Sequence, residues 1–327
     1  MKKILALLLA TASLAWSQIT YTPKDGPGQG KRVVLLAGDE EYRSEEGLPM
    51  LAKLLSQRHG FACTVVFPID PATGTIDPNN QSHLPGLASL QDADCVIMLW
   101  RFRNPPTEKL KHFADYFLAG KPIIALRTST HAFNIGDKGS PYAKWSWNSG
   151  GPWPGGFGQQ VLGETWINHH GDHGTESTRA LIDPAAKEHA LLRGVGEIWG
   201  PTDVYGIKNL PADATVLLRG QVVAGMKPAD PPVEGAKNTP MMPVAWTREY
   251  KNEAGNTNKI LTTTMGDAKD LESEGLRRLI VNGVYAFTGL DVPAKADVTP
   301  VGDYNPTFFG FNKFIKGVKP EERGLKE

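Results

Sequence analysis

Short apolar runs alternate with amphipathic stretches through the first half of the chain. Residues 32–37 (RVVLLA) form a nearly continuous apolar run, which is typical of a strand buried on both faces. Residues 45–58 have helical spacing, with Ser44 as the expected N-cap and Gly60 as the expected stop. The other elements expected here are strands over 63–67, 95–100 and 122–126 and a helix over 107–118. This alternation predicts an α/β fold, with a parallel sheet and helices on both of its faces.

The second half of the chain is richer in strand patterns. Its expected elements are strands over 177–182, 215–223, 242–250 and 259–265, a further strand after the turn that begins at Gly200, and helices over 184–192 and 271–289. The tail after Leu290 has little periodicity and is expected to wrap the surface. Because no internal repeat or clear linker interrupts the pattern, we expect one domain, residues 18–290, followed by a C-terminal extension, residues 291–327.

The first residues have the pattern of a targeting segment. Lys2 and Lys3 precede an apolar run over 4–14, and Ala15-Trp16-Ser17 is a small-x-small cleavage signal. We therefore expect residues 1–17 to be a signal peptide and the protein to be exported, to the periplasm or the extracellular space. The alternative is an N-terminal membrane anchor, but the run is short for a bilayer span. No later segment is long and apolar enough, so no membrane association is expected after cleavage.

Composition narrows the classes of partner. The 35 basic and 35 acidic side chains give a net charge of zero, so the chain lacks the basic footprint of a nucleic-acid-binding protein. Cys63 and Cys95 both lie in strand-like runs, which favours buried free thiols over a disulfide even in an exported protein. Nothing in the composition decides whether the chain forms a homo-oligomer.

Polar residues follow three of the strands expected in the first half. Because ligands bind beyond the carboxyl ends of parallel strands, these three segments are expected to meet at one site. Each segment also has a structural explanation, since the acids can favour a helix N-terminus and the arginines can pair with them. The candidates are Asp39, Glu40, Glu41, Tyr42 and Arg43 after the first strand, Arg101 and Arg103 after the third, and Arg127, Thr128 and His131 after the fourth.

A loop rich in tryptophan, glycine and histidine, residues 145–179, is expected to close over this site. Gly171 and Gly174 interrupt any regular element around its histidines, and long ordered loops of this kind usually line a site. Four tryptophans, at 145, 147, 153 and 166, can stack on sugar faces, although core packing is expected for at least two of them. The candidates from this loop and the segment after it are Trp147, Asn148, Trp166, His169, His170, Asp172, His173 and Asp203.

Six blocks of sequence in a fixed order resemble the trehalose-utilisation (ThuA-like) family over nearly the whole mature chain. The tail GDYNPTFFGFNKFIKGVKP (302–320) adds a resemblance to the exported branch of planctomycete- and verrucomicrobia-type bacteria. The blocks are GDEEYRSEE (38–46), GKPIIALRTSTHAF (120–133), WPGGFGQQVLGETWINHHGDHG (153–174), IWGPTDVYG (198–206), PMMPVAWTREY (240–250) and TTTMGDAKDLESEGLRRLIVNGVYAFTGL (262–290).

The resemblance implies a flavodoxin-like sheet of the class I glutamine amidotransferase-like superfamily, with the β-rich second half as insertions. It also implies a role in sugar catabolism, on sugars, glycosides or oxidised (3-keto) glycosides. Amidotransferases place a nucleophilic cysteine on the turn after a central strand, whereas this turn, residues 126–130, reads LRTST. Glutamine hydrolysis by a thiolate is therefore not expected. Many family members have histidine where Arg127 and Asp267 stand here.

Three mechanisms remain open from the sequence. In the first, His169 and His173, with Asp172 or a carboxylate at a strand end, bind zinc or a similar divalent metal, which would be the only cofactor. The alternative is that these histidines hydrogen-bond to sugar hydroxyls or to the loop. In the second, Asp39, Glu40 or Glu41 works with His131 or His169 as general acid and base. In the third, which has the weakest support, His131 activates Ser129 as a nucleophile.

The expected partner is a small-molecule carbohydrate. Acid/base chemistry would make the protein a hydrolase, lyase or isomerase of sugars or keto sugars. The alternative is a non-catalytic protein that binds a carbohydrate in an aromatic and polar cleft.

Overall fold

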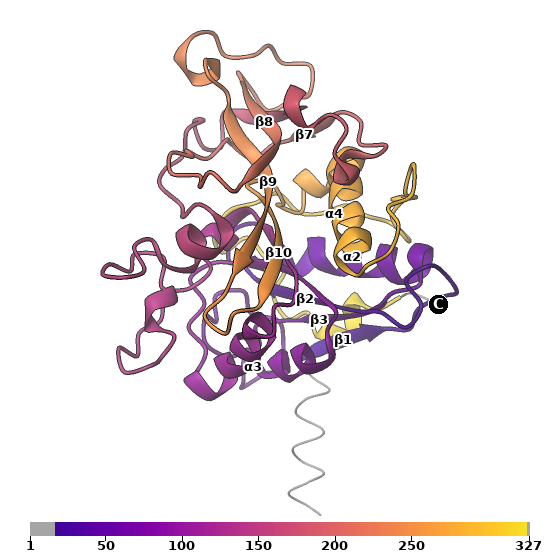
Figure 1. Cartoon of the computed structure of the whole chain (residues 1–327). Coiled ribbons are helices and arrows are strands. Elements are labelled where there is room, and N and C mark those ends of the chain that lie inside the picture. The colour runs from indigo at the N-terminus through magenta and orange to yellow at the C-terminus, as the bar shows by residue number, and fades with distance from the viewer. Residues whose placement is uncertain (1–16, 326–327) are drawn as a thin grey trace, which may run out of the picture.

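The computed structural model describes residues 17–325, and a single sheet of ten strands runs through them (Figure 1). Its strand order is β1-β3-β2-β4-β5-β10-β9-β8-β6-β7. The strands are β1 (Gln18–Tyr21), β2 (Arg32–Gly38), β3 (Ala62–Val66), β4 (Cys95–Trp100), β5 (Ile123–Leu126), β6 (Ser177–Ile182), β7 (Ile198–Gly200), β8 (Thr215–Val223), β9 (Met242–Lys251) and β10 (Thr257–Thr263).

The centre of the sheet is parallel and has the flavodoxin-like order. β3, β2, β4, β5 and β10 are neighbours, and every pairing among them is parallel. Counted along the chain these five strands have the order 2-1-3-4-5, which defines that fold type. Residues 33–38 of β2 and all of β4 and β5 are buried, as their continuous apolar runs predict. The predicted fold class is therefore confirmed.

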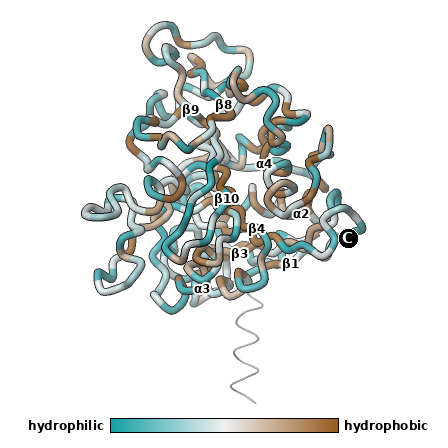
Figure 2. Tube along the Cα trace, in the orientation of Figure 1, coloured by the Kyte–Doolittle hydropathy of each residue, from teal (hydrophilic) through white to brown (hydrophobic). Residues whose placement is uncertain are grey.

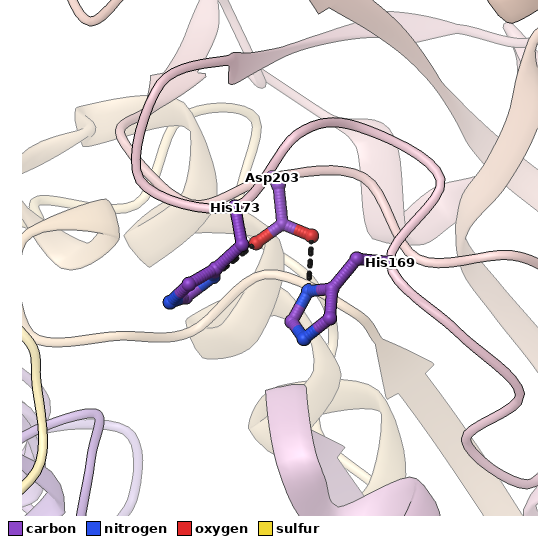
Figure 3. Close-up of side chains that lie close together, drawn as sticks. All are labelled: His169, His173 and Asp203. Atoms are coloured by element: carbon purple, nitrogen blue, oxygen red, sulfur yellow. Dashed lines mark hydrogen bonds and ion pairs between the residues drawn. The ribbon is translucent and has the colours of Figure 1, made fainter.

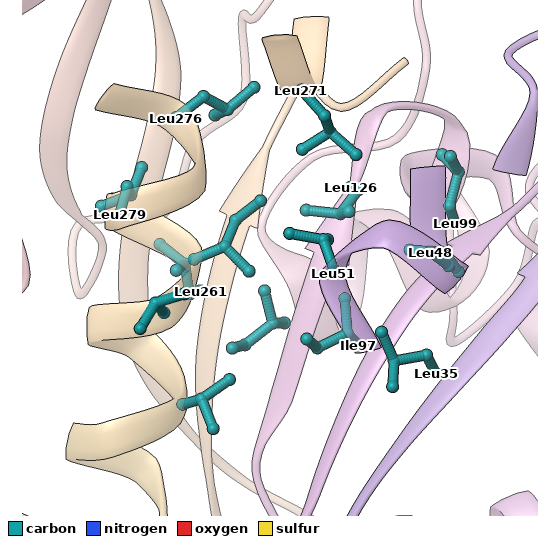
Figure 4. Packing of buried hydrophobic residues seen from close by; sticks show 14 of the residues in the cluster. Leu35, Leu48, Leu51, Ile97, Leu99, Leu126, Leu261, Leu271, Leu276 and Leu279 are labelled. Carbon is teal, nitrogen blue, oxygen red and sulfur yellow. The ribbon is translucent and has the colours of Figure 1, made fainter. Parts of the chain in front are cut away.

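Helices cover both faces of this parallel centre. The α-helices are α2 (Ser44–His59), α3 (Thr107–Leu118) and α4 (Glu274–Phe287). Leu35, Ile97 and Leu126 point to one face, where they pack with Leu51 of α2 and Leu279 of α4 (Figure 4). The alternate residues of the strands pack with α3 and the 3₁₀ turns at 85–92 on the other face. Among the described helices, none has both the length and the apolar character for a membrane span.

An insertion between β5 and β10, residues 127–256, extends the sheet with antiparallel strands. β10 pairs with β9, and β8, β6 and β7 continue the same edge. Figure 2 shows hydrophobic residues along the central strands and α4, whereas the loops of the insertion are more hydrophilic. The predicted β-rich insertion is therefore part of the one continuous sheet.

Three local predictions were wrong. Ser44 is the first residue of α2 and not its cap, because its hydroxyl accepts hydrogen bonds from the backbone N–H groups of Gly38 and Asp39. Residues 184–192 form two 3₁₀ turns, at 184–186 and 190–192, and no continuous helix. The strand predicted after Gly200 is reduced to a single bridge between Tyr205 and His169. The expected stop of α2 is confirmed, since Gly60 caps it with φ of 77°.

The C-terminal extension crosses the molecule from α4 to the beginning of α2. Val292 and Val298 pack in the core beside α4. Further on, Thr307 donates two hydrogen bonds to the Glu46 carboxylate, and the Gly310 N–H donates to the Glu41 carbonyl at 2.9 Å. The extension therefore reaches the carboxyl end of β2. Its separate status from the main domain stays a prediction, as does the signal peptide, since residues 1–16 lie outside the described residues.

The two cysteines are free and buried. Cys63 on β3 and Cys95 on β4 are both paired in register with Val33 of β2, one on each side of it.

Candidate functional site

The carboxyl ends of β2, β4 and β5 meet at a small pocket that the insertion covers from one side. Its cavity volume is about 40 Å³. Six of its eight lining residues are aromatic or imidazole side chains, and one acid and one arginine complete it. The lining residues are Glu41, Tyr42, Arg101, Phe102, His131, Trp166, His169 and Tyr205.

The backbone after each of these strands takes a conformation that side chains disfavour. Arg43, Phe102 and Arg127 have φ angles of 52°, 51° and 42°, in the left-handed region. A residue other than glycine in this region costs roughly 1–3 kcal/mol, and such residues cluster at functional sites. Their position at three neighbouring strand ends marks this edge of the sheet as the site.

Glu40 is fully engaged beside the pocket and does not line it. Its two carboxylate oxygens accept hydrogen bonds from Arg101 at 2.5 Å and from Arg103 at 2.7 Å. Arg103 is completely buried and also donates to the backbone carbonyls of Arg101, Pro78 and Asn80. Glu40 and Arg103 therefore form a structural ion pair, which was the alternative to a role in substrate binding or catalysis.

Asp39 is also held by internal partners. One carboxylate oxygen accepts hydrogen bonds from the N–H groups of Glu41 and Tyr42, both at 2.7 Å, and the other accepts from the Thr128 hydroxyl. Burial, with the nearby charge of Glu40, raises the pKa of Asp39 to about 6. These bonds fix the loop after β2, so Asp39 and Thr128 shape the pocket from beneath.

Arg127 lies under the pocket between two tyrosine rings. Its guanidinium carbon is 4.7 Å from the ring centre of Tyr42 and 3.8 Å from that of Tyr205. It donates to the carboxylate of Asp203 at 2.9 Å and to the carbonyls of Asp203 and Thr264. The arginine therefore joins the turn after β5 to the segment that follows β7.

Two histidines share the Asp203 carboxylate. His169 Nδ1 lies 2.6 Å from one oxygen and His173 Nδ1 lies 2.9 Å from the other (Figure 3). His173 Nε2 lies 3.2 Å from a carboxylate oxygen of Glu41. The cluster thus joins the histidine loop, the segment after β7 and the loop after β2.

Charge explains the protonation of this cluster. Burial alone would raise the pKa of Asp203, but Arg127 and the two histidines outweigh it and hold this pKa well below its usual range. Hydrogen bonds to Asp203 and Glu41 raise the pKa of His173 to about 9. At neutral pH, His173 is therefore a cation that donates one N–H to each carboxylate.

His169 lines the pocket and uses only one of its ring nitrogens in a hydrogen bond to a described residue. An ionised carboxylate only accepts hydrogen bonds, so Nδ1 of His169 carries the proton that points at Asp203. Its other ring nitrogen lies on the side away from Asp203 (Figure 3), and the ring lines the pocket. In the neutral ring this nitrogen is a base whose orientation Asp203 fixes.

His131 faces the same pocket as a neutral imidazole. Burial, helped by the charges of Arg101 and Arg127, lowers its pKa well below the usual value. Its ring contacts Phe102 and Trp166, and Nδ1 lies 3.2 Å from the Thr130 hydroxyl. A neutral imidazole can donate a hydrogen bond to a carbonyl oxygen without bringing a net charge into the site.

The cluster fits hydrogen bonds better than a divalent metal. Ligand atoms of His169, His173 and Asp203 do lie within 4.8 Å of one another. However, Nδ1 of His169 is only 2.6 Å from the Asp203 oxygen, whereas two ligands about 2.1 Å from a tetrahedral zinc ion are about 3.4 Å apart. Arg127 also already neutralises Asp203.

Four predicted site residues lie outside both the pocket lining and the side-chain clusters beside it. The Asp172 carboxylate pairs with Lys237 at 2.9 Å and is 72% exposed. The carboxylate that binds His169 and His173 is that of Asp203 and not that of Asp172. His170 donates from Nε2 to the Lys237 carbonyl at 2.8 Å. Asn148 is exposed. The Arg43 guanidinium is buried under the C-terminal extension, where it donates to the Gly310 carbonyl.

Ser129, the candidate nucleophile with the weakest support, has a structural position. Its hydroxyl donates to the Met98 carbonyl at 2.9 Å and accepts from the Trp100 N–H at 3.2 Å. These bonds tie the turn after β5 to β4. The residue is completely buried, so it is not available to a substrate.

The four tryptophans of the loop divide into two pairs. Trp145 is buried in the hydrophobic core, and Trp153 packs against the same core. Trp166 lines the pocket, and Trp147 contacts both Trp166 and Phe102, with ring centres 6.2 Å and 5.6 Å apart.

Sequence reasoning missed three aromatic residues of the site. Phe102 stands between two predicted site arginines, so the strand-end rule could have found it. Tyr205 follows Asp203 by two residues and covers Arg127. Phe309 packs on Tyr42 and His173, with ring centres 5.5 Å and 5.4 Å away, and no sequence signal connects it to them.

Comparison with known proteins agrees with the fold. No family model matches the chain, and none of the curated proteins matches it. A protein from Parabacteroides merdae ATCC 43184 that is described as ThuA-like has a similar solved structure, with a TM-score of 0.51 and 15% identity over 86% of this chain and 98% of that chain. Another protein described as ThuA-like, from Bacteroides uniformis ATCC 8492, has a TM-score of 0.48 and 15% identity over 84% of this chain and 98% of that chain. The first likeness shows that the two chains share an α/β fold.

Proposed function

We propose that this chain is an exported, carbohydrate-active enzyme of the ThuA-like family, which acts on oxidised (3-keto) glycosides by acid/base chemistry. One observation carries the proposal: His169, which the buried Asp203 orients through one ring nitrogen, lines a pocket together with the neutral His131. The blocks of sequence similar to the ThuA-like family and the fold shared with the protein described as ThuA-like support the family.

The reaction that suits these two imidazoles is removal of a proton next to a carbonyl group. His169 takes the C2 proton of a 3-keto glycoside, and the electron pair left on C2 forms an enolate with the C3 carbonyl. The neutral His131 donates a hydrogen bond to the developing oxyanion. When the enolate collapses, the C1–O bond breaks and the departing oxygen takes the proton from His169. The products are an unsaturated keto sugar and a free alcohol.

The residues around the two imidazoles position them. Arg127 and His173 keep Asp203 ionised, so that it accepts the His169 N–H in both protonation states of that ring. Glu41 lines the pocket and holds His173 from its other side. Trp166 contacts both His131 and His169, with ring centres 5.7 Å from each.

The test uses a 3-keto glucoside with a p-nitrophenyl leaving group, whose release is followed by absorbance. His169→Gln should lower turnover by about 10²–10⁴-fold, the usual contribution of a positioned general base. His170→Gln is the matched control, because its ring donates to the Lys237 carbonyl and does not line the pocket, and it should retain turnover. Equal activity in wild type and His169→Gln would reject the assignment.

The same preparations decide between this mechanism and two alternatives. Near-stoichiometric zinc or another divalent metal in wild type, lost in His169→Gln, would favour the metal-assisted mechanism over ours. Saturable binding of the keto glucoside without product release or exchange of the C2 proton for solvent deuterium would favour a non-catalytic binding protein.

A further inference from the structure

The pocket is too small to hold a whole sugar. A cavity that holds one water molecule measures about 10–15 Å³ and a cavity that binds benzene about 150 Å³, whereas the volume of this pocket is about 40 Å³. A pyranose ring with its hydroxyl groups needs several times that volume. Only the reacting edge of a sugar can therefore enter between His131 and His169, and the rest of the molecule has to lie over the mouth of the pocket.

A row of aromatic side chains begins at this mouth. Trp166 and Phe102 line the pocket, and Trp147 contacts both of them. Arg101 is next to Phe102, with its guanidinium carbon 4.6 Å from the centre of that ring. Phe311 covers the other end of the row, 4.9 Å from the same carbon. We call these five residues the aromatic rim.

Phe311 extends the rim from a distant part of the chain. Its side chain is half exposed. The neighbouring Gly310 is held on both sides, because its N–H donates to the Glu41 carbonyl and its carbonyl accepts from Arg43. The C-terminal extension therefore presents this ring to solvent from an anchored position.

Arg101 gives the rim hydrogen-bond donors. One of its terminal nitrogens binds Glu40, and this pairing offsets its charge. Its side chain is 19% exposed, and it lines the pocket between the two phenylalanines. Flat aromatic faces beside fixed polar donors suit a sugar, whose rings have apolar C–H faces and hydroxyl edges.

We propose that the aromatic rim is an outer subsite that binds the second sugar ring of a disaccharide, while the first ring presents its reacting edge to the pocket. The identity of the reacting ring rests on the proposed function, whereas binding at the rim does not. The protein should therefore prefer disaccharides to simple glycosides.

The test measures binding by saturation-transfer NMR and by quenching of tryptophan fluorescence, with trehalose, maltose, cellobiose and methyl glucoside as probes. At least one disaccharide should bind about tenfold more tightly than methyl glucoside and receive saturation on both rings. Phe311→Ala should weaken that disaccharide about fivefold to tenfold and leave methyl glucoside unchanged, as expected for loss of one stacking contact.

Phe308→Ala is the matched control. Phe308 is on the same segment and is 45% exposed against 50% for Phe311, but its ring stacks on Phe309 and not on Arg101. It should bind all four probes as wild type does. The proposal is overturned if no disaccharide binds, if disaccharides bind no better than methyl glucoside, or if both variants lose affinity equally. Failure of the proposed catalysis is a separate outcome, because the keto glucoside can remain uncleaved while a disaccharide still binds at the rim and loses affinity in Phe311→Ala.

Discussion

Two clusters of charged side chains meet at the pocket, and they differ in how many of their polar atoms already have a hydrogen-bond partner. The strand-end cluster, Glu40 with Arg101 and Arg103, satisfies both carboxylate oxygens and is largely buried. In the histidine cluster, Asp203 is equally buried, but His169 and His173 are each about one-third exposed. His169 uses one ring nitrogen on Asp203, and its other ring nitrogen lies on the side away from that carboxylate.

Because of this difference, the strand-end cluster suits a role in stability and the histidine cluster suits the proposed proton transfer. A carboxylate whose two oxygens each accept a hydrogen bond from an arginine has no free oxygen with which to move a proton. An imidazole that one carboxylate orients keeps a free base on its other side. In the proposed mechanism the insertion, which places the histidines, therefore supplies the reacting groups, and the parallel centre supplies a fixed frame.

Removing the strand-end carboxylate has the largest expected effect on stability. Glu40→Gln leaves the fully buried Arg103 without its counter-charge, and breaking such a pair costs about 3 kcal/mol. We expect the free energy of unfolding, measured by urea denaturation, to fall by that amount. At urea concentrations below the unfolding transition, the folded variant should turn over the keto glucoside as wild type does. A loss of turnover in fully folded Glu40→Gln, with unchanged stability, would reverse the roles assigned to the two clusters.

The second prediction concerns the pH dependence of stability. The pKa of His173 is raised to about 9 in the folded protein, so its contribution to stability is complete below pH 6.5 and is lost as pH rises through 9. Because the side chain is 34% exposed, solvent screening limits the contribution to about 1 kcal/mol.

Urea denaturation of wild type and His173→Gln at pH 6 and pH 9.5 measures this contribution. The gap between the two proteins should shrink at the higher pH. A gap that stays constant would mean that His173 is not charged in the folded protein, and that its bonds to Asp203 and Glu41 are those of a neutral ring.

The smallest effect is expected at the exposed edge of the histidine loop. Asp172→Asn removes only a solvent-exposed pairing with Lys237, which also binds Glu176. We expect stability to change by less than about 0.5 kcal/mol and turnover to remain at the wild-type level. If Asp172→Asn instead lost both a bound metal and its activity, Asp172 would be a metal ligand, as predicted from the sequence.

The parallel centre could be predicted because its signals are local. The apolar run of β2 and the glycine after α2 each report a constraint on a few neighbouring residues, and both appear in the structure as expected. Ser44 fits an N-cap by the same local reasoning, but tertiary structure overrides it, since its hydroxyl binds the backbone at the end of β2.

The site could be predicted only to the level of segments. Glu40 and Glu41 are adjacent and chemically alike, yet one is clamped by arginines and the other lines the pocket. His169 and His170 differ in the same way. Which of two neighbours faces the pocket depends on backbone angles and on partners far away in sequence, such as Asp203, and the residue types do not encode these.

The position of the two cysteines has a practical consequence. Both are in register with Val33 on opposite sides of β2, so two strand spacings, roughly 9.5 Å, separate their Cα atoms. A disulfide needs these atoms within about 7 Å, so the native sheet holds the two thiols apart. The folded chain therefore forms no disulfide between them, and recombinant protein made in a reducing or an oxidising compartment should have the same two free thiols.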